Sequence, residues 1–210
     1  MDSEDERKER KTRLDTFISL LLGVSLSAAC GFRVFVPLLV VSAAAIVGHL
    51  DLPSNVAWVG TDHALIAFAV ASSLEIAGYY IPWFDHLLDT VATPLAIVAG
   101  TVVTAATAPD MSPLAQWTLA AIAGGGAAGL TKGLLNLLRI GSTATSGGLT
   151  NPILSTLELI AALGLSALAI ALPVVAGVIV LGVLPFVTYR LWRFLFKRQP
   201  RPSTIDEAVP

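Results

Sequence analysis

Long apolar stretches, each close to the length needed to cross a bilayer, make up most of this chain between residues 16 and 195. A hydrocarbon core of roughly 30 Å requires about 20 helical residues to span it. Stretches of this kind occupy residues 16–49, 63–82, 90–108, 114–140, 153–172 and 173–195. The composition agrees, because 55% of the residues are hydrophobic and 13% are charged, whereas soluble domains carry about 25% charged residues. The sequence therefore predicts an all-α integral membrane protein, and prolines and glycines within the apolar runs favour broken helices over a β-barrel.

Basic residues gather at the two ends of the chain, with five in residues 7–13 and five in residues 190–201. Since short basic flanks stay on the cytoplasmic side during insertion, we expect both termini in the cytoplasm and an even number of crossings. The predicted organisation is a charged cytoplasmic segment, two membrane regions and a cytoplasmic tail, at residues 1–14, 15–108, 109–195 and 196–210. A formal net charge of -2 gives a nucleic-acid partner no basic surface to bind.

The first apolar stretch, residues 16–49, is too long for one straight crossing. Gly31 and Pro37 bracket the break that we expect within it. Residues 50–62 are polar and contain no basic residue, so they read as a loop on the outer side. The uncharged polar segment 142–150 and the Asn151 that follows it either line an ion or substrate site or form an ordinary flexible loop.

An internal duplication is visible in the spacing of two motifs. Ser72-Ser73-Leu74-Glu75-Ile76 matches Ser155-Thr156-Leu157-Glu158-Leu159, and further along Ile97–Val103 matches Val174–Val180. Repeated halves are typical of membrane transporters, so the fold prediction is a bundle of about six to eight transmembrane or re-entrant helices in two related halves. With residues 50–62 outside and the polar segment after Arg139 inside, three crossings per half are favoured, which would make the halves inverted, whereas an even number would make them parallel. Chance alignment of apolar segments is the alternative.

Glu75 and Glu158 lie near the middle of predicted spans. A charged side chain there costs about 2.5–3.5 kcal/mol on insertion scales, so each carboxyl must be paired, protonated or in contact with water. One interpretation makes the two carboxyls a shared proton or cation site. The other makes each a neutral group that hydrogen-bonds a neighbouring helix.

Arg33 and Lys132 are the basic residues that we expect to act as counter-ions and to attract an anionic substrate. The alternative is that their long side chains extend to the membrane surface. Asp85 and Asp89 are one helical turn apart beside His86, and they either join the ion or substrate site or face water. As metal ligands they form a weak pattern. With a single Cys in the chain, we expect no metal, no other cofactor and no disulfide.

Gly125, Gly129 and Gly133 recur at every fourth residue. This spacing lets two helix backbones approach closely, which is how helices pack in lipid. We therefore expect this face to be available for association of two copies of the chain.

Several of these pieces together resemble a known bacterial family of multi-pass membrane proteins, the domain of unknown function 4126. The resembling pieces are Ser73-Leu74-Glu75-Ile76-Ala77-Gly78-Tyr79-Tyr80-Ile81-Pro82-Trp83 with Asp85 and Asp89, Gly31-Phe32-Arg33, Thr131-Lys132-Gly133, and Ser142-Thr143-Ala144-Thr145 with Gly147-Gly148 and Asn151-Pro152. The resemblance implies a protein of the bacterial cytoplasmic membrane and supplies no mechanism.

The leading functional hypothesis is a transporter, channel or lipid flippase for a small or anionic substrate, driven by a proton or cation. A structural or assembly protein of the membrane is the second hypothesis, and an intramembrane enzyme is the third. Familiar soluble-enzyme motifs such as a nucleophile elbow, HExxH or a P-loop do not occur in the sequence, so we expect no enzymatic activity.

Overall fold

The computed structural model describes the backbone of residues 2–108 and 111–196, and the side chains of residues 4–81, 87–108 and 111–194. All regular elements of this part of the chain are helical. They are α1 (Asp2–Phe32), α2 (Phe35–Ile46), a short 3-10 helix η1 (Ala57–Gly60), α3 (Asp62–Gly78), α4 (Pro82–Thr107), α5 (Pro113–Leu119), a π-helical segment η2 (Ala120–Gly125), α6 (Gly126–Ser146), α7 (Asn151–Ala171) and α8 (Pro173–Phe196).

Four of the described helices are long and apolar enough to cross a membrane, as judged by length and composition. These spans are Glu4–Phe32, Leu87–Thr107, Asn151–Ala171 and Pro173–Phe194. The predicted all-α class is therefore confirmed, and the four candidate spans are compatible with a membrane protein. The number of crossings and the duplication of halves stay predictions.

Local sequence signals set several of the helix ends. Thr61 caps the start of α3, because its hydroxyl accepts a hydrogen bond from the Ala64 backbone N–H at 3.2 Å. Pro113 is the first residue of α5, a position that suits proline because the N–H that it lacks would have no partner there. At the end of α6, Gly147 has a φ of 64°, a left-handed conformation that glycine adopts without strain. The predicted loop at 142–150 is shorter than expected, because α6 continues through Ser146.

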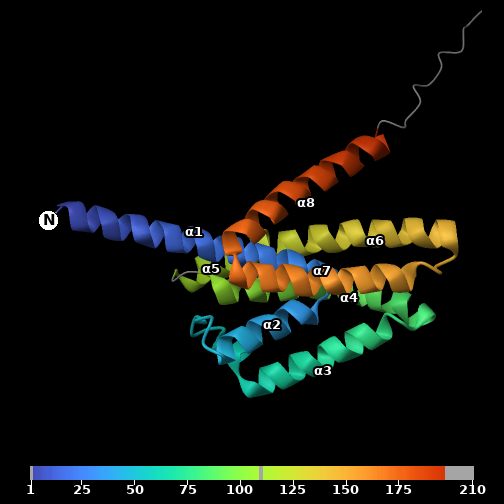
Figure 1. Cartoon of the computed structure of the whole chain (residues 1–210), viewed down its shortest axis with the longest axis horizontal. Helices are drawn as coiled ribbons and strands as arrows, with labels where there is room; N and C mark the ends of the chain where they lie inside the picture. Colours follow the sequence, from blue (N-terminus) through green and yellow to red (C-terminus); the bar gives the residue numbers. More distant parts are fainter. Residues whose placement is uncertain (1, 109–110, 197–210) are drawn as a thin grey trace, which may run out of the picture.

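The long first apolar stretch breaks where the sequence predicts. Helix α1 ends at Phe32 and α2 begins at Phe35, between Gly31 and Pro37. Figure 1 shows α2 turning back from the end of α1 toward the side on which α1 begins. Only Arg33 and Val34 lie between the two helices, so this turn places a charged residue inside the bundle.

Helix α1 is the central helix of the bundle, and it contacts α4, α6, α7 and α8. Small residues allow the close packing around it. A Cβ added at Gly31 would lie 2.7 Å from the Ala128 carbonyl oxygen of α6, and one at Gly23 would lie 3.3 Å from the Thr104 Cα of α4. The first distance is too short for a larger residue and the second is tighter than most Cβ contacts. Close approach at small residues is how helices associate in lipid, where burial of apolar surface gives little driving force.

Glycines also join α4 to the η2 segment. A Cβ added at Gly124 would lie 2.5 Å from the Gly100 carbonyl oxygen. Gly125 and Gly129 face Ile97 of α4 in the same way, at 3.2 Å and 3.1 Å. Two of the three glycines expected to face a second copy therefore pack within the chain, while a Cβ at Gly133 would meet open space. Association of copies through this face stays a prediction.

Helix α8 diverges from the rest of the bundle, as Figure 1 shows. Pro173 follows α7 directly, and Leu172 between the two helices has a φ of -140°, outside the helical range. Most of α8 is exposed in the isolated chain, with Val178, Phe186 and Trp192 at 65%, 59% and 62%. These apolar surfaces suit contact with lipid.

Candidate functional site

Six ionisable side chains from four helices and the α1–α2 turn meet inside the bundle. We call this group the ionic cluster, and its members are Arg33, Glu75, Asp89, Lys132, Arg139 and Glu158. Three are basic and three are acidic, so their formal charges cancel. Five are buried, with exposed fractions between 1% and 6%, and the Asp89 side chain is 17% exposed.

Arg139 of α6 makes the most contacts of the basic members. Its Nε donates to Glu158 Oε1 at 3.0 Å and its Nη2 donates to Glu158 Oε2 at 2.5 Å. The same Nη2 donates to Ser155 Oγ at 3.0 Å, and Nη1 lies 3.5 Å from Asp89 Oδ2. This paired geometry is the strong form of an Arg–carboxylate contact, and it joins α6 to α7 and α4.

Lys132 of α6 pairs with Asp89 of α4. Its Nζ donates to Asp89 Oδ1 at 2.9 Å and to the Tyr79 hydroxyl at 3.0 Å. The Tyr79 hydroxyl in turn donates to Asp89 Oδ1 at 3.0 Å. The three groups form a closed triangle of hydrogen bonds, and the polar atoms of a buried lysine are satisfied in this way.

The Tyr79 ring lies at the centre of the basic residues. The Cζ atoms of Arg33 and Arg139 are 4.1 Å and 4.6 Å from the ring centroid, and Lys132 Nζ is 5.3 Å from it. Cations within about 6 Å of an aromatic face are attracted to it, more strongly where water is excluded. Tyr79 is only 2% exposed, so its ring helps to stabilise three buried positive charges.

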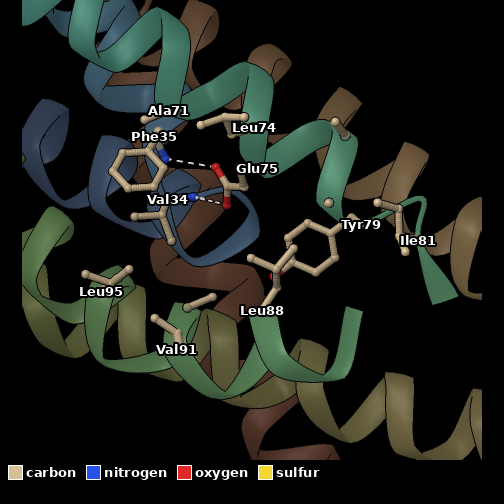
Figure 2. A pocket seen from close by; sticks show the side chains of 13 residues that line it. Val34, Phe35, Ala71, Leu74, Glu75, Tyr79, Ile81, Leu88, Val91 and Leu95 are labelled. Atoms are coloured by element: carbon tan, nitrogen blue, oxygen red, sulfur yellow. Dashed lines mark hydrogen bonds between the residues drawn. The ribbon is translucent and has the colours of Figure 1, made fainter. Parts of the chain in front are cut away.

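Glu75 has a different set of partners. Its Oε1 accepts from the Val34 backbone N–H at 2.8 Å and its Oε2 accepts from Phe35 at 3.1 Å, as Figure 2 shows. These N–H groups, at the start of α2, have no acceptor within the helix, and the apolar side chain of Val34 at the N-cap cannot accept a hydrogen bond from them. A carboxylate at a helix N-terminus is favoured by the helix dipole. Glu75 therefore caps α2 from the neighbouring helix α3.

Arg33, in the turn between α1 and α2, is only partly satisfied. Its Nη2 donates to the Ser155 carbonyl at 2.7 Å and lies 4.0 Å from Glu158 Oε2. Its Nε and Nη1 are buried and have no hydrogen-bond partner within the described part of the chain. Buried donors of this kind are rare, so two nitrogens of Arg33 are left without an acceptor inside the bundle.

Two cavities border the ionic cluster. The first, about 540 Å³, is the α3–α4 groove. It is lined by Val34, Phe35, Ala71, Leu74, Glu75, Ala77, Gly78, Tyr79, Ile81, Leu88, Val91, Ala92 and Leu95. The second, about 570 Å³, is the α4–α6 pocket, whose lining includes Asp89, Thr93, Asn136, Arg139 and Thr143. The lining of the first is apolar except for Glu75 and Tyr79, and six of the eight residues that line the second carry polar side chains. Tyr79 in one is bonded to Asp89 in the other.

Most of the candidate residues from the sequence are in this cluster. Glu75, Glu158, Arg33, Lys132 and Asp89 come together from distant parts of the chain. The pairing differs from the expectation, because Lys132 bonds Asp89 and Glu75 bonds backbone N–H groups. None of the described basic members extends to the surface.

Two candidates fall outside this description. Asn151 lies at the start of α7, two turns before Glu158, and accepts a hydrogen bond from Ser142 at 3.1 Å, so it holds the α6–α7 turn. The Asp85 side chain lies outside the described residues. Among the described side chains, no group of three or more His, Cys, Asp and Glu could hold a metal ion.

Two members of the site were not expected from the sequence. Arg139 is one of only three basic residues between the terminal clusters, a signal that could have marked it. Tyr79 stands in a run of aromatic residues that reads as an interfacial belt, and nothing in its spacing separates it from Tyr80. Tyr80 is 47% exposed, so only the packing distinguishes the two.

One comparison with known proteins identifies a family, and its description assigns no role to the cluster. The profile of the family described as domain of unknown function (DUF4126) matches residues 20–193. No curated protein and no solved structure matches the chain. The matched range contains every member of the ionic cluster and both cavities.

Proposed function

Since the chain belongs to the DUF4126 family, whose description assigns no activity, we propose a function from geometry: a membrane transporter or flippase for an anionic substrate, coupled to a proton. The ionic cluster binds the substrate's polar group, and Glu75 carries the proton. The proposal assigns no catalytic step to the chain.

The observation that carries this proposal is a formally neutral ionic cluster that borders an apolar groove and a second cavity lined mostly by polar side chains, with two buried donors of Arg33 unpaired. Ionisable residues inside a membrane protein are costly to bury and usually mark a path for an ion or substrate. The two cavities reach the cluster from two sides, at Glu75 in the first and at Asp89 and Arg139 in the second.

The contacts divide the two acidic motifs into different roles. Glu75 lines the α3–α4 groove and is held by two backbone N–H groups, so a proton can reach it without separating an ion pair. Glu158 is held by two nitrogens of Arg139 and positions that guanidinium. Both Glu residues, with Ser72 and Ser155, are buried, which supports the proposed duplication of the two halves.

Localisation follows from the same proposal. We place the chain in the bacterial cytoplasmic membrane with both termini in the cytoplasm, on the basis of the terminal basic residues. Two copies would associate through the part of the glycine face that stays open at Gly133.

The experiment uses the full chain in liposomes with an entrapped pH dye and a fluorescent phosphatidylglycerol. Wild-type protein should translocate the lipid faster under an imposed pH gradient, with measurable proton flux. Glu75→Gln should lose the gradient dependence, because its side chain still accepts a hydrogen bond but no longer takes up a proton. Asp62→Asn, at the exposed start of the same helix, should behave as wild type. The proposal fails if wild-type protein moves neither lipid nor protons above protein-free liposomes.

A structural role is the second candidate, and one observation favours it. Ion pairs among four members of the cluster join three helices, as expected for residues that hold helices together. These members are Lys132, Asp89, Arg139 and Glu158. Glu75 likewise joins α3 to the start of α2 through two backbone N–H groups. A structural role therefore predicts that Glu75→Gln lowers the melting temperature, whereas transport predicts a stable chain that has lost coupling.

A further inference from the structure

We propose that the α4–α6 pocket is a water-filled entrance from one end of the bundle, and that Asp89, which lines it, exchanges protons with this water. The inference rests on the proposed transport function and names the residue at which its proton meets water. The family description assigns no role to this pocket.

The size and lining of the pocket suit water. Its volume of about 570 Å³ is many times the roughly 30 Å³ that a water molecule takes up in the liquid. Hydroxyl, amide and charged groups in the lining offer the two to four polar partners that a bound water requires. The residues that carry these groups are Asp89, Thr90, Thr93, Asn136, Arg139 and Thr143.

The pocket lies close to one end of the bundle. Arg139 is seven residues before Ser146, the last residue of α6, and Asp89 is seven residues after Pro82, the first residue of α4. At 1.5 Å per residue, each is about 10 Å from the end of its helix. Figure 1 shows these two helix ends on the same side of the bundle. The candidate span of α4 begins at Leu87, so Asp89 lies within its first turn, where water from the membrane surface can reach it.

Asp89 is the member of the ionic cluster that water reaches most readily. Its side chain is 17% exposed, whereas the other five members are between 1% and 6% exposed. Its Oδ1 accepts hydrogen bonds from Lys132 and Tyr79. Its Oδ2 accepts no hydrogen bond from the residues that the structure describes, and it lies 3.5 Å from Arg139 Nη1. Oδ2 is therefore the oxygen with a position left for a proton.

Transfer of a proton to Asp89 changes the charge of the cluster. A hydronium ion gives its proton to Oδ2 and is left as a water molecule, and the carboxylate becomes a neutral carboxylic acid. Among the described residues, the charged or titratable groups around Asp89 are Lys132, Arg139 and Tyr79. The cluster then has one net positive charge, which favours an anion. Binding of an anionic substrate and protonation of Asp89 therefore favour each other, as reciprocal coupling between two sites requires.

Tyr79 separates this entrance from the α3–α4 groove. Tyr79 lines the groove, Asp89 lines the pocket, and Lys132 Nζ donates to both side chains. On the far side of this hydrogen-bonded triangle, the lining of the groove is apolar except for Glu75 and Tyr79. We therefore expect water-soluble reagents to reach Asp89 and lipid-soluble reagents to reach Glu75.

The first test is chemical modification of carboxyl groups in the full chain in liposomes, with the modified residues located by peptide mass spectrometry. One probe is a water-soluble carbodiimide with glycine ethyl ester, present on both faces of the membrane, and the other is dicyclohexylcarbodiimide, which partitions into lipid. The water-soluble probe should modify Asp89 and leave the buried Glu158 unmodified, while the lipid-soluble probe should modify Glu75 in preference to Asp89. Asp62, which is exposed, is the positive control for the water-soluble probe.

The second test detects water in the pocket through single cysteines in a Cys30→Ser background. Thr90→Cys places a thiol in the lining, and Leu138→Cys is the matched control. Both residues are exposed and eight residues from the same end of the bundle, but Leu138 does not line the pocket. A charged methanethiosulfonate reagent on both faces of the membrane reacts with thiolate, which forms in water, so we expect Thr90→Cys to react at least about tenfold faster than Leu138→Cys.

The inference is overturned if the water-soluble probe leaves Asp89 unmodified, or if the two cysteines react at equal rates. Neither measurement requires transport. Both expected results without any proton flux would therefore refute the proposed transport alone, whereas proton flux with no modification of Asp89 would refute the entrance alone.

The role of Asp89 in the proton step has its own variant. Asp89→Asn keeps the shape of the side chain but cannot take up a proton, so proton flux in liposomes should be lost. Continued protection of the buried Cys30 from thiol reagents would show that the bundle is still folded. Flux equal to that of wild type would refute proton exchange at Asp89.

Discussion

Replacing Arg139 by Met should destabilise the fold far more than any exposed Arg can, because Arg139 holds the buried Glu158. The variant keeps a side chain of similar length and removes the two nitrogens that lie 3.0 Å and 2.5 Å from the carboxylate. Glu158 would then retain Arg33 Nη2 at 4.0 Å as its remaining basic neighbour of the cluster. Asp89 loses one contact but keeps Lys132 and Tyr79.

The magnitude follows from the burial of the group left behind. Glu158 is 4% exposed, and removing one partner of a buried ion pair typically costs 3–5 kcal/mol, roughly, because the other charge stays buried without compensation. For a chain of this length, each kcal/mol lowers the melting temperature by about 2–4 °C. We therefore expect Arg139→Met to melt on the order of 10 °C lower than wild type.

Cys30 provides the assay. It is the only cysteine of the chain and is fully buried in α1, so a thiol-reactive fluorogenic dye should label it only when the bundle opens. Fluorescence recorded during heating in mild detergent then reports the unfolding of the central helix. No additional cysteine has to be introduced for this measurement.

The matched control is Arg13→Met. Arg13 also pairs with a carboxylate at short range, Glu9 at 2.7 Å, but its side chain is 79% exposed, and such surface pairs contribute about 0–1 kcal/mol. The double variant Arg139→Met with Glu158→Gln should recover part of the loss, since it removes the stranded charge. The reasoning is refuted if Arg139→Met melts within 2 °C or so of Arg13→Met, a difference of about 1 kcal/mol or less.

Three further predictions use the same assay. Gly124→Ala should lower the free energy of unfolding by about 1–3 kcal/mol, because its Cβ would lie 2.5 Å from the Gly100 carbonyl oxygen. Gly126→Ala has open space around it and should be neutral or slightly stabilising. Equal effects of the two substitutions would contradict the close contact between α4 and η2. Tyr79→Phe should lose about 1–3 kcal/mol, since it leaves Lys132 Nζ one acceptor short while the ring stays, and an unchanged melting temperature would argue against the hydrogen-bonded triangle. Ser27→Ala should lose roughly 1 kcal/mol through its hydrogen bond to the Gly100 carbonyl, and no loss would show that this contact is dispensable.

The helices could be predicted from the sequence more completely than the site. The expected spans at 90–108, 153–172 and 173–195 coincide with α4, α7 and α8 to within a turn or two, because each is bounded by proline or by polar residues. The break in the first stretch was also predictable, since glycine lowers the stability of a helix interior and proline is tolerated only in the first turn of a helix, where Pro37 lies in α2. The end of α6 was placed too early, because Ser and Thr are compatible with a helix when their hydroxyls bond the preceding turn.

The side-chain pairing was not predictable. Lys132 and Arg139 are seven residues apart on α6, and both contact Asp89 of α4. Which carboxylate they contact depends on the rotation of α4 and α6 about their own axes. The capping of α2 by Glu75 depends on the position of α3 beside the α1–α2 turn. Neither geometry leaves a mark in residue spacing.

The amino-acid sequence by itself determined that the chain forms apolar helices, where most of them begin and end, and which charged residues must be held within them, because these properties depend on hydropathy and on neighbours along the chain. Only the tertiary structure decided which charges meet, that Tyr79 lies among three cations, and that one side of the cluster opens to an apolar groove. These features arise between segments far apart in the sequence, where helix rotation and close contact at glycines set distances that composition does not encode.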